Sequence, residues 1–364
     1  MARLGDIATV ITKGTTPTSI GFVFQNEGIN FVKIESVDEN GNFICEKFDH
    51  ISDECHEKLK RSQLQENDIL FSIAGAIGRT AIVTKEILPA NTNQALAIIR
   101  IPHGTINYSF LLYILQSSVV LKQADKKKQG VAQLNLSLKD IGDFVIPDLP
   151  LEKQQEIVDN LDKVSNLIYL RKQQLSKLDE LVKSRFIEMF GDRGQNPFNY
   201  PTTTMGDVYK FQYGKGNNIP EDKGEYLCYG SNGVVGHHTE YNSEDSPIIG
   251  HIGAYAGIVN WGKGKHYVTY NGVICKLIHD KVNPVYGFYL LQLQDYNTVA
   301  KAGAAQPFVS YKDLEVPVVN IPSLERQNQF AAFVEQTDKS KFEIQKSLEK
   351  LETLKKALMQ KYFG

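Results

Sequence analysis

The chain has 364 residues, which is long enough for two ordinary domains that each bury a core. Its composition, 42% hydrophobic and 23% charged, is typical of a globular protein and excludes a disordered one. The formal net charge of −2 argues against a strongly basic nucleic-acid-binding chain, so any contact with nucleic acid must use locally arranged charge or be shared with another subunit.

Two further classes are disfavoured. No apolar run approaches the ~20 residues that span a bilayer, and the first residues lack the pattern of a signal peptide, so we expect no membrane contact and a cytoplasmic location. Four cysteines, Cys45, Cys55, Cys228 and Cys275, show no CxxC spacing. They are expected to be reduced thiols, and no metal site is predicted.

Residues 1–145 have the mixed pattern of an α+β module. Short β-branched runs with glycine-rich turns predict strands within residues 68–83, and residues 109–124 predict one helix. Two loops, residues 12–19 and 89–95, are rich in Lys, Thr, Asn and Gln, which can bind bases and phosphates. Such residues are also common in ordinary turns, and this is the alternative interpretation of the loops.

Residues 152–190 contain neither proline nor glycine and predict a long helix. Apolar residues recur there at spacings of three and four, interrupted at Arg171 and Arg185, which indicates a coiled-coil stripe: Leu161, Val164, Ile168, Leu175, Leu178, Val182 and Met189.

Residues 196–320 return to the α+β pattern, with strands predicted within residues 246–261 and one helix over residues 285–300. Turn-rich polar loops occur at residues 213–218 and 229–238. A second long helix then carries its own stripe, broken in the middle by Thr337 and Lys341: Phe330, Val334, Ile344, Leu348, Leu351, Leu358 and Tyr362. Because amphipathic helices of this length need a partner, we expect the two helices to pair; the alternative is that each only covers its own module.

The chain repeats itself. Residues 130–141, GVAQLNLSLKDI, return 173 positions later as GAAQPFVSYKDL, and the match continues without a gap to Phe190-Gly191 and Phe363-Gly364. A gapless register of this length indicates two variable modules, each followed by one copy of a fixed segment. The repeated Gln133 and Gln306 are expected to join the last strand of a module to its helix; the alternative is that they face a ligand.

Catalytic motifs are missing. The sequence has no P-loop, no HExxH and no [ND]PP[YF] loop of a DNA adenine methyltransferase, for which the nearest string is NPFNY at residues 196–200. The chain is therefore predicted to be non-catalytic.

Two variable modules and two repeated long helices resemble the specificity (S) subunit of type I restriction–modification systems, over essentially the whole chain. The resemblance is carried by the paired strings at 130–141 and 303–314, by the helix starts at 150–154 and 322–327, and by residues 74–83 and 91–95. The second module departs from the pattern, because GAYAG at residues 253–257 replaces a clean GxxGxT turn.

The resemblance implies an α+β fold with two globular target recognition domains separated by two long antiparallel helices that form a coiled coil. Each domain would read one half of a bipartite double-stranded DNA site, and the helices would dock two methyltransferase (M) subunits, with restriction (R) subunits as further partners. S-adenosylmethionine and ATP would belong to those partners, and this chain would hold no cofactor. The expected domains are residues 1–148 and 192–320 for recognition, with residues 149–191 and 321–364 as the helices.

Loop side chains would contact the DNA directly. The candidates are Lys13, Thr15, Thr16, Arg79, Asn93 and Gln94 in the first module, and Lys215, Asn217, Asn232, Tyr255 and Asn271 in the second. Three alternatives remain: a specificity subunit of a methyltransferase that has no nuclease, a coiled-coil adaptor whose modules bind protein, and a chain that is itself a DNA methyltransferase.

Overall fold

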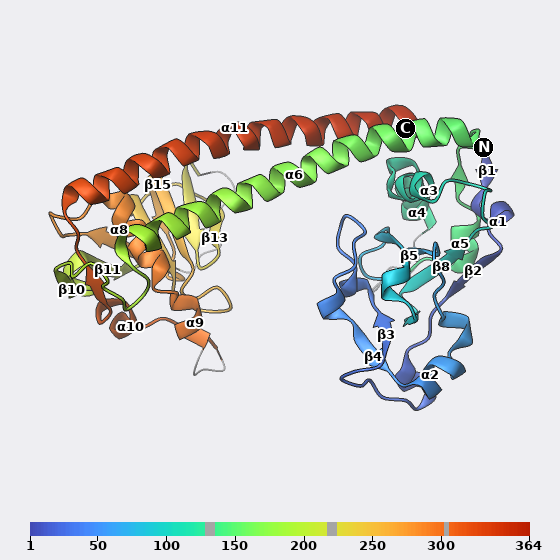
Figure 1. Ribbon diagram of the computed structural model, residues 1–364, viewed down its shortest axis with the longest axis horizontal. Coiled ribbons are helices and arrows are strands. Elements are labelled where there is room, and N and C mark those ends of the chain that lie inside the picture. Colours follow the sequence, from blue (N-terminus) through green and yellow to red (C-terminus); the bar gives the residue numbers. More distant parts are fainter. Residues whose placement is uncertain (128–134, 217–223, 302–305) are drawn as a thin grey trace. The chain divides into compact units, whose positions relative to one another are not determined.

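The computed structural model describes residues 1–127, 135–216, 224–301 and 306–364 (Figure 1). The chain divides into two compact units: the first holds residues 1–170 and 347–364, and the second holds residues 171–346. Each unit contains one globular module together with one end of each long helix. Two residues named in the sequence analysis, Gln133 and Asn217, lie outside the described residues.

The first module is built on two small sheets and a separate two-stranded pair. Its strands are β1 (Ala2–Arg3), β2 (Val10–Lys13), β3 (Ile29–Val32), β4 (Asp49–Ile51), β5 (Ile69–Ser72), β6 (Thr80–Ile82), β7 (Ala90–Thr92), β8 (Leu96–Arg100) and β9 (Val145–Ile146). The separate pair is formed by β1 and β9. Its α-helices are α1 (Leu4–Ile7), α2 (Asp53–Lys58), α3 (Tyr108–Gln116), α4 (Ser118–Lys127) and α5 (Leu138–Gly142). Short 3₁₀ turns are η1 (Pro17–Ile20), η2 (Ile34–Ser36), η3 (Cys45–Lys47), η4 (Lys60–Ser62) and η5 (Lys85–Ile87).

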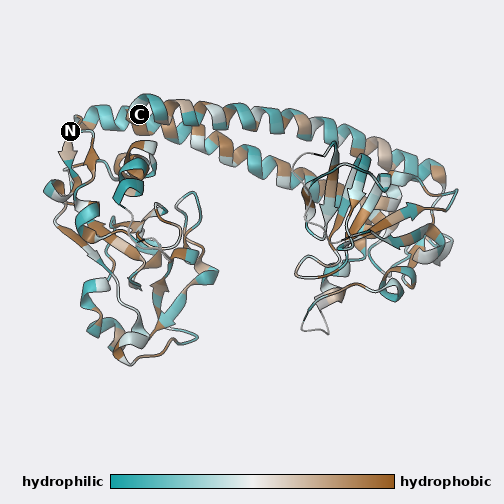
Figure 2. Cartoon of the chain, turned by 180° about the vertical axis from the view of Figure 1, so that it is seen from behind, coloured by the Kyte–Doolittle hydropathy of each residue, from teal (hydrophilic) through white to brown (hydrophobic). Residues whose placement is uncertain are grey.

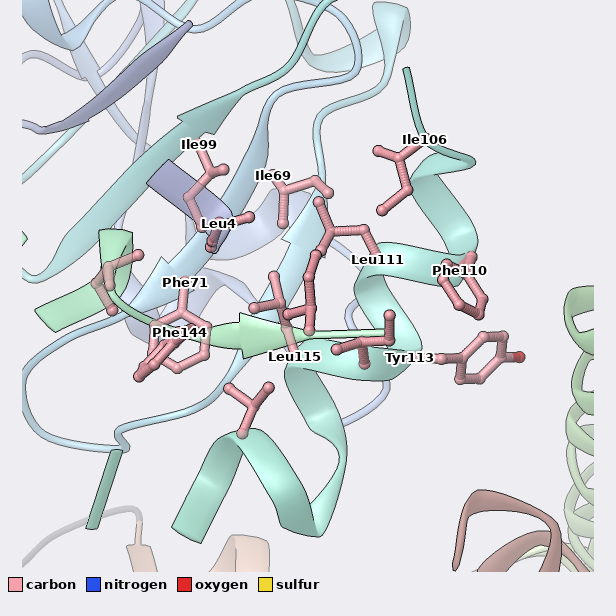
Figure 3. Packing of buried hydrophobic residues seen from close by; sticks show 14 of the residues in the cluster. Leu4, Ile69, Phe71, Ile99, Ile106, Phe110, Leu111, Tyr113, Leu115 and Phe144 are labelled. Atoms are coloured by element: carbon pink, nitrogen blue, oxygen red, sulfur yellow. The ribbon is translucent and has the colours of Figure 1, made fainter. Parts of the chain in front are cut away.

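The central strand β5 of the first module's larger sheet is buried on both faces. Alternate side chains of a strand point to opposite faces, and on β5 Ile69 and Phe71 join one apolar cluster while Leu70 joins another. Figure 3 shows the first cluster, in which Leu111 of α3 lies near Ile69 and the rings of Phe71 and Phe144 meet edge to face. Because each fully buried apolar side chain contributes roughly 1.5–3 kcal/mol, this double burial stabilises the strand that leads into the loops described below.

The second module is built mainly on one sheet. Its strands are β10 (Thr202–Thr204), β11 (Tyr209–Tyr213), β12 (Tyr226–Gly230), β13 (Gly233–His238), β14 (Ser243–Gly250), β15 (Val259–Val268), β16 (Gly272–Leu277) and β17 (Val318–Asn320). Its helices are α7 (Met205–Val208), α8 (Pro284–Leu293), α9 (Tyr296–Lys301) and α10 (Tyr311–Glu315).

The two modules share one order of strands. The second sheet runs β11-β16-β14-β15-β12-β13, and the first module runs β2-β8-β5-β6 in one sheet and β4-β3-β7 in the other. β15 therefore takes the places of both β6 and β7, which in the first module are separated by η5. β6 pairs antiparallel with β5, as β15 does with β14. β7 pairs parallel with β3, as β15 does with β12. The predicted strands within residues 68–83 and 246–261 are confirmed.

The single helices predicted over residues 109–124 and 285–300 are wrong, because each segment forms two helices. Ser117, between α3 and α4, has extended backbone with φ −73° and ψ 155°. Asp295, between α8 and α9, has a left-handed φ of 49°. A helix does not continue through either conformation, so the apolar face turns to a new direction at these residues.

Both long helices form as predicted, as α6 (Leu151–Phe190) and α11 (Leu324–Phe363). Every side chain of the two predicted stripes is buried or half-buried, and Figure 2 shows hydrophobic residues recurring along both helices. In the first unit Asn160 of α6 donates to the hydroxyl of Tyr362, near the end of α11, at 3.2 Å. In the second unit Phe186, near the end of α6, packs on Phe330, near the start of α11, with ring centroids 5.2 Å apart. The helices are therefore paired antiparallel, which confirms the expected coiled coil.

The repeated S-x-K-D strings cap short helices. At α5 the Ser137 hydroxyl accepts from the Asp140 N–H at 3.1 Å, and the Asp140 carboxylate accepts from the Ser137 N–H at 3.0 Å. Ser310 and Asp313 form the same reciprocal pair at α10. The hydrogen bond from the Ser137 hydroxyl lowers the pKa of Asp140. This part of the repeat is therefore structural: it starts the short helix that precedes each long helix.

Candidate nucleic-acid interface

Two loops of the first module lie against each other where β2 and β7 end. The Thr15 N–H donates to the Thr92 carbonyl at 3.2 Å. Gly14 allows this approach, because a Cβ atom there would overlap the Thr92 carbonyl oxygen. The contact brings together five of the six residues predicted for this module: Lys13, Thr15, Thr16, Asn93 and Gln94.

The side chains of these loops also contact one another. The Thr16 hydroxyl donates to the amide oxygen of Gln94. The Asn93 side chain accepts from the Ala95 N–H at 3.0 Å and so shapes its own turn. Arg61, just after α2, approaches the Thr15 hydroxyl at 3.5 Å. Sequence reasoning missed Arg61, since its pairing with Thr15 joins residues that are far apart in the sequence.

Arg79 is held elsewhere. Its Nη1 donates to the carbonyls of Ile34 and Val37 at 3.1 and 3.0 Å, and the side chain is half-buried. These bonds tie the turn after β5 to η2, so part of the guanidinium supports the backbone of the module. The structure does not group Arg79 with the five loop residues.

The second module places its loops in the same way. A Cβ atom on Gly214 would overlap the Thr269 carbonyl oxygen, and the Lys215 N–H donates to the Val268 carbonyl at 3.0 Å. The Ser231 hydroxyl is 2.8 Å from the Ile252 carbonyl and 2.7 Å from the Asn271 carbonyl. The structure therefore joins the loops that hold four predicted residues: Lys215, Asn232, Tyr255 and Asn271, all of them exposed.

An aromatic cluster, Tyr213, His251, Tyr270 and Tyr311, lies among these loops. The Tyr213 ring stacks on Tyr311 at 4.3 Å between centroids and tilts against His251 at the same distance. Tyr270 meets His251 edge to face at 5.3 Å. Sequence reasoning missed the cluster, although Tyr213 and Tyr270 lie beside predicted residues, because its members come from four separate segments.

Burial sets the protonation of this cluster. It lowers the pKa of His251, opposed by the ring's hydrogen bond to the Tyr270 carbonyl, and it raises the pKa of Tyr213. Both side chains are therefore neutral at pH 7, and the cluster offers rings and hydroxyls rather than charge.

Replacing Gly14 with alanine should separate the two loops of the first module. The new methyl group must displace the Thr92 carbonyl, and overpacking of this kind costs about 1–3 kcal/mol. We expect a lower urea midpoint by circular dichroism and faster amide hydrogen exchange at Thr15. Gly142→Ala is the matched control, because a Cβ there makes only ordinary contacts. Unchanged exchange at Thr15 in Gly14→Ala would contradict the proposed role of the glycine.

Among the described residues no group of three His, Cys, Asp or Glu side chains could hold a metal ion. All four cysteines are free, as predicted, and burial raises the pKa of Cys55, Cys228 and Cys275. In the described part of the chain, none of the helices combines the length and apolar character needed to cross a membrane.

Comparison with known proteins places both halves of the chain in one family. The family model described as "Type I restriction modification DNA specificity domain" matches residues 1–180 and again residues 193–356. The EcoprrI specificity subunit of a type I restriction enzyme from Escherichia coli is 28% identical over 356 residues, covering 90% of this chain and 85% of the relative. The EcoBI specificity subunit, also from Escherichia coli, is 34% identical over 140 residues, which cover 38% of this chain and 29% of the relative.

Solved structures agree on the fold. The S subunit of a type I restriction–modification system from M. genitalium matches with a TM-score of 0.56 at 15% identity, covering all of this chain and 95% of that one. A structure from a study of complex assembly in a type I system matches with a TM-score of 0.58 at 17% identity, covering all of this chain and 96% of that one. With both halves matched, the chain belongs to the type I restriction modification DNA specificity family and is a non-catalytic specificity subunit with two recognition domains.

Proposed function

We propose that this subunit recognises a two-part double-stranded DNA site, with one half read by each module. The observation that carries the proposal is the repeated loop arrangement, in which Gly14 and Gly214 let a polar loop close on a neighbouring turn. Two modules with the same loop arrangement in one chain are better suited to a DNA site of two halves than to one continuous site.

The proposed DNA contacts are the loop residues that each module gathers. They are Lys13, Thr15, Thr16, Asn93 and Gln94 in the first module, and Lys215, Asn232, Tyr255 and Asn271 in the second. Arg79 and Asn217 remain further candidates. Side chains of these types bind base edges and phosphates, and lysine adds local positive charge despite the net charge of −2. Residues 1–148 and 192–320 are the proposed recognition domains, and residues 149–191 and 321–364 the proposed helical segments.

The proposed protein partners are two methyltransferase (M) subunits. Support comes from apolar side chains that are exposed in both copies of the repeat, at positions 173 residues apart. Tyr169 of α6 is 58% exposed and its counterpart Phe342 of α11 is 63% exposed. The other pairs are Val145 with Val318, Leu151 with Leu324, and Leu181 with Leu354. Exposed apolar groups favour protein contacts, and their repetition favours two copies of one partner.

Family membership implies that this chain holds no cofactor of its own. S-adenosylmethionine would be bound by the M subunits, and ATP by restriction (R) subunits where these join the complex. The proposed site of action is the cytoplasm.

The proposal is tested by expressing the chain with its M subunits and mapping the methylated adenines by modified-base sequencing. We expect a motif of two specific parts separated by unspecified bases. The purified complex should also shift a duplex that carries the motif, and changes to either half should weaken the shift. A complex that methylates a single continuous motif would contradict the proposal, and one that shows no sequence-selective shift would favour a coiled-coil adaptor.

A further inference from the structure

The loops of the two modules can be aligned residue by residue from strand pairing, although their sequences differ. Lys13 faces Ala97 between β2 and β8, and Tyr213 faces Val273 between β11 and β16. Ser72 faces Leu96, and Gly250 faces Gly272. Both ladders align residues 96–97 with residues 272–273.

Hydrogen bonds outside the strands give the same alignment. The Ile73 N–H donates to the Ala95 carbonyl at 2.9 Å, and the His251 N–H donates to the Asn271 carbonyl at 2.8 Å. Thr92 and Val268 likewise accept from the loops that follow Gly14 and Gly214. The turn residue just before Ala95 is Gln94, and the one just before Asn271 is Tyr270.

Gln94 and Tyr270 therefore occupy the same position in the two modules. Both are exposed, Tyr270 by 43%. Gln94 follows β7, which pairs parallel with β3, and Tyr270 follows β15, which pairs parallel with β12. Gln94 lies beside the loop that begins at Gly14, and Tyr270 lies beside the loop that begins at Gly214. The backbone around this position makes corresponding hydrogen bonds in both modules, and the side chain is different.

The surroundings of Gln94 orient its amide. The Thr16 hydroxyl donates to the Gln94 amide oxygen. Within the described part of the chain, one lone pair of that oxygen and both hydrogens of the amide nitrogen have no further partner. A primary amide that offers one acceptor beside one donor matches the N6 amino group and N7 of adenine in the major groove. Because Thr16 already restricts the rotamer, less conformational freedom is lost on binding.

The surroundings of Tyr270 select a different contact. Its ring rests edge-on against His251, which is buried, and the His251 imidazole also hydrogen-bonds the Tyr270 carbonyl at 3.3 Å. In the first module, Ile73 corresponds to His251 and Lys13 corresponds to Tyr213. Tyr270 thus presents a supported ring and one hydroxyl, and the ring suits contact with a thymine methyl group.

We propose that Gln94 and Tyr270 are equivalent specificity positions, one in each module, and that Gln94, oriented by Thr16, reads an adenine in the half-site of the first module. Thr16 is a positioning residue, because it acts through Gln94. The inference deepens the proposed function and rests on it.

The test uses the full chain expressed with its M subunits, and it reads the methylated motif and the affinity for duplexes changed at single base pairs. Gln94→Ala should lower discrimination at one A·T pair of one half-site by roughly 5- to 150-fold. Thr16→Val should lower discrimination at the same pair by a smaller factor, and Thr16→Ser should restore it. Tyr270→Ala should relax one position of the other half-site only.

Thr18→Ala is the matched control, since Thr18 is an exposed residue of the same loop, and it should keep the original motif. Circular dichroism should be unchanged in all these variants, because Gln94, Tyr270 and Thr18 are exposed and the half-buried Thr16 is replaced by residues of similar size. An unchanged motif in Gln94→Ala, a relaxed G·C pair, or a uniform loss of affinity for every duplex would overturn the inference. A wild-type complex without sequence preference would instead refute the proposed function itself.

Discussion

Gln327→Leu should lower the free energy of unfolding of the second unit by about 3 kcal/mol, because three backbone groups lose a hydrogen-bond partner whose side chain is itself fully buried. The Gln327 amide oxygen accepts from the Asn283 N–H at 2.8 Å. Its nitrogen donates to the carbonyls of Lys281 and Pro322 at 2.9 and 2.8 Å. The side chain is 0% exposed, so water cannot replace these bonds, and the start of α11 loses its connection to the start of α8.

The chain contains one tryptophan, Trp261, and it lies on β15 of the second module. Urea unfolding followed by Trp261 fluorescence therefore reports on the second unit. The neighbouring Asn328 is exposed, so Asn328→Ala should cost well under the loss in Gln327→Leu. A Gln327→Leu midpoint equal to that of Asn328→Ala would contradict the predicted role.

The first unit supplies a second control. Gln154 accepts from the Asn107 N–H at 2.8 Å and donates to the Leu149 carbonyl at 2.7 Å, so it makes the same junction at the start of α6. Gln154→Leu should destabilise the first unit by circular dichroism and leave the Trp261 transition nearly unchanged. The repeat thus preserves a glutamine that holds a module on its helix.

These glutamines illustrate what the sequence predicts and what it does not. Their repetition was visible in the sequence, but their partners are backbone groups, which leave no pattern of residue types. The structural role of Arg79 was not predictable for the same reason, because its guanidinium donates to two backbone carbonyls. The long helices were predictable because the spacing of their apolar residues is a local property, set by the geometry of one helix pair.

The candidate site was predictable in part. Loop composition selected residues such as Thr16 and Gln94, and the fold brought them together. The aromatic cluster of the second module was not predictable, because Tyr213 and Tyr311 are adjacent only once the sheet has formed. Breaks such as Asp295 were missed for a similar reason: a left-handed residue is selected by the packing of α8 and α9 around it, and the local sequence stays compatible with one helix.

Phe186→Ala should be the most damaging single truncation in the second unit, with an expected loss of about 3–5 kcal/mol in the free energy of unfolding. Phe186 is 2% exposed and lies where α6, α8 and α11 meet. Its ring stacks on Tyr286 at 5.3 Å and meets Phe190 and Phe330 edge to face at 5.0 and 5.2 Å. Removing it leaves a cavity that those rings cannot close, because each is fixed by the others.

Fluorescence of Trp261 again gives the measurement, and Phe342→Ala gives the matched control. Phe342 is an aromatic residue of α11 that is 63% exposed, so its truncation should change the unfolding free energy little. Phe186→Leu should recover part of the loss, since it restores apolar volume without the edge-to-face contacts. A Phe186→Ala midpoint within error of that of Phe342→Ala would show that the three helices hold together without this ring. The expected result is the opposite: the module and both helices of this unit should unfold together at a lower urea concentration, because one aromatic side chain is common to all three.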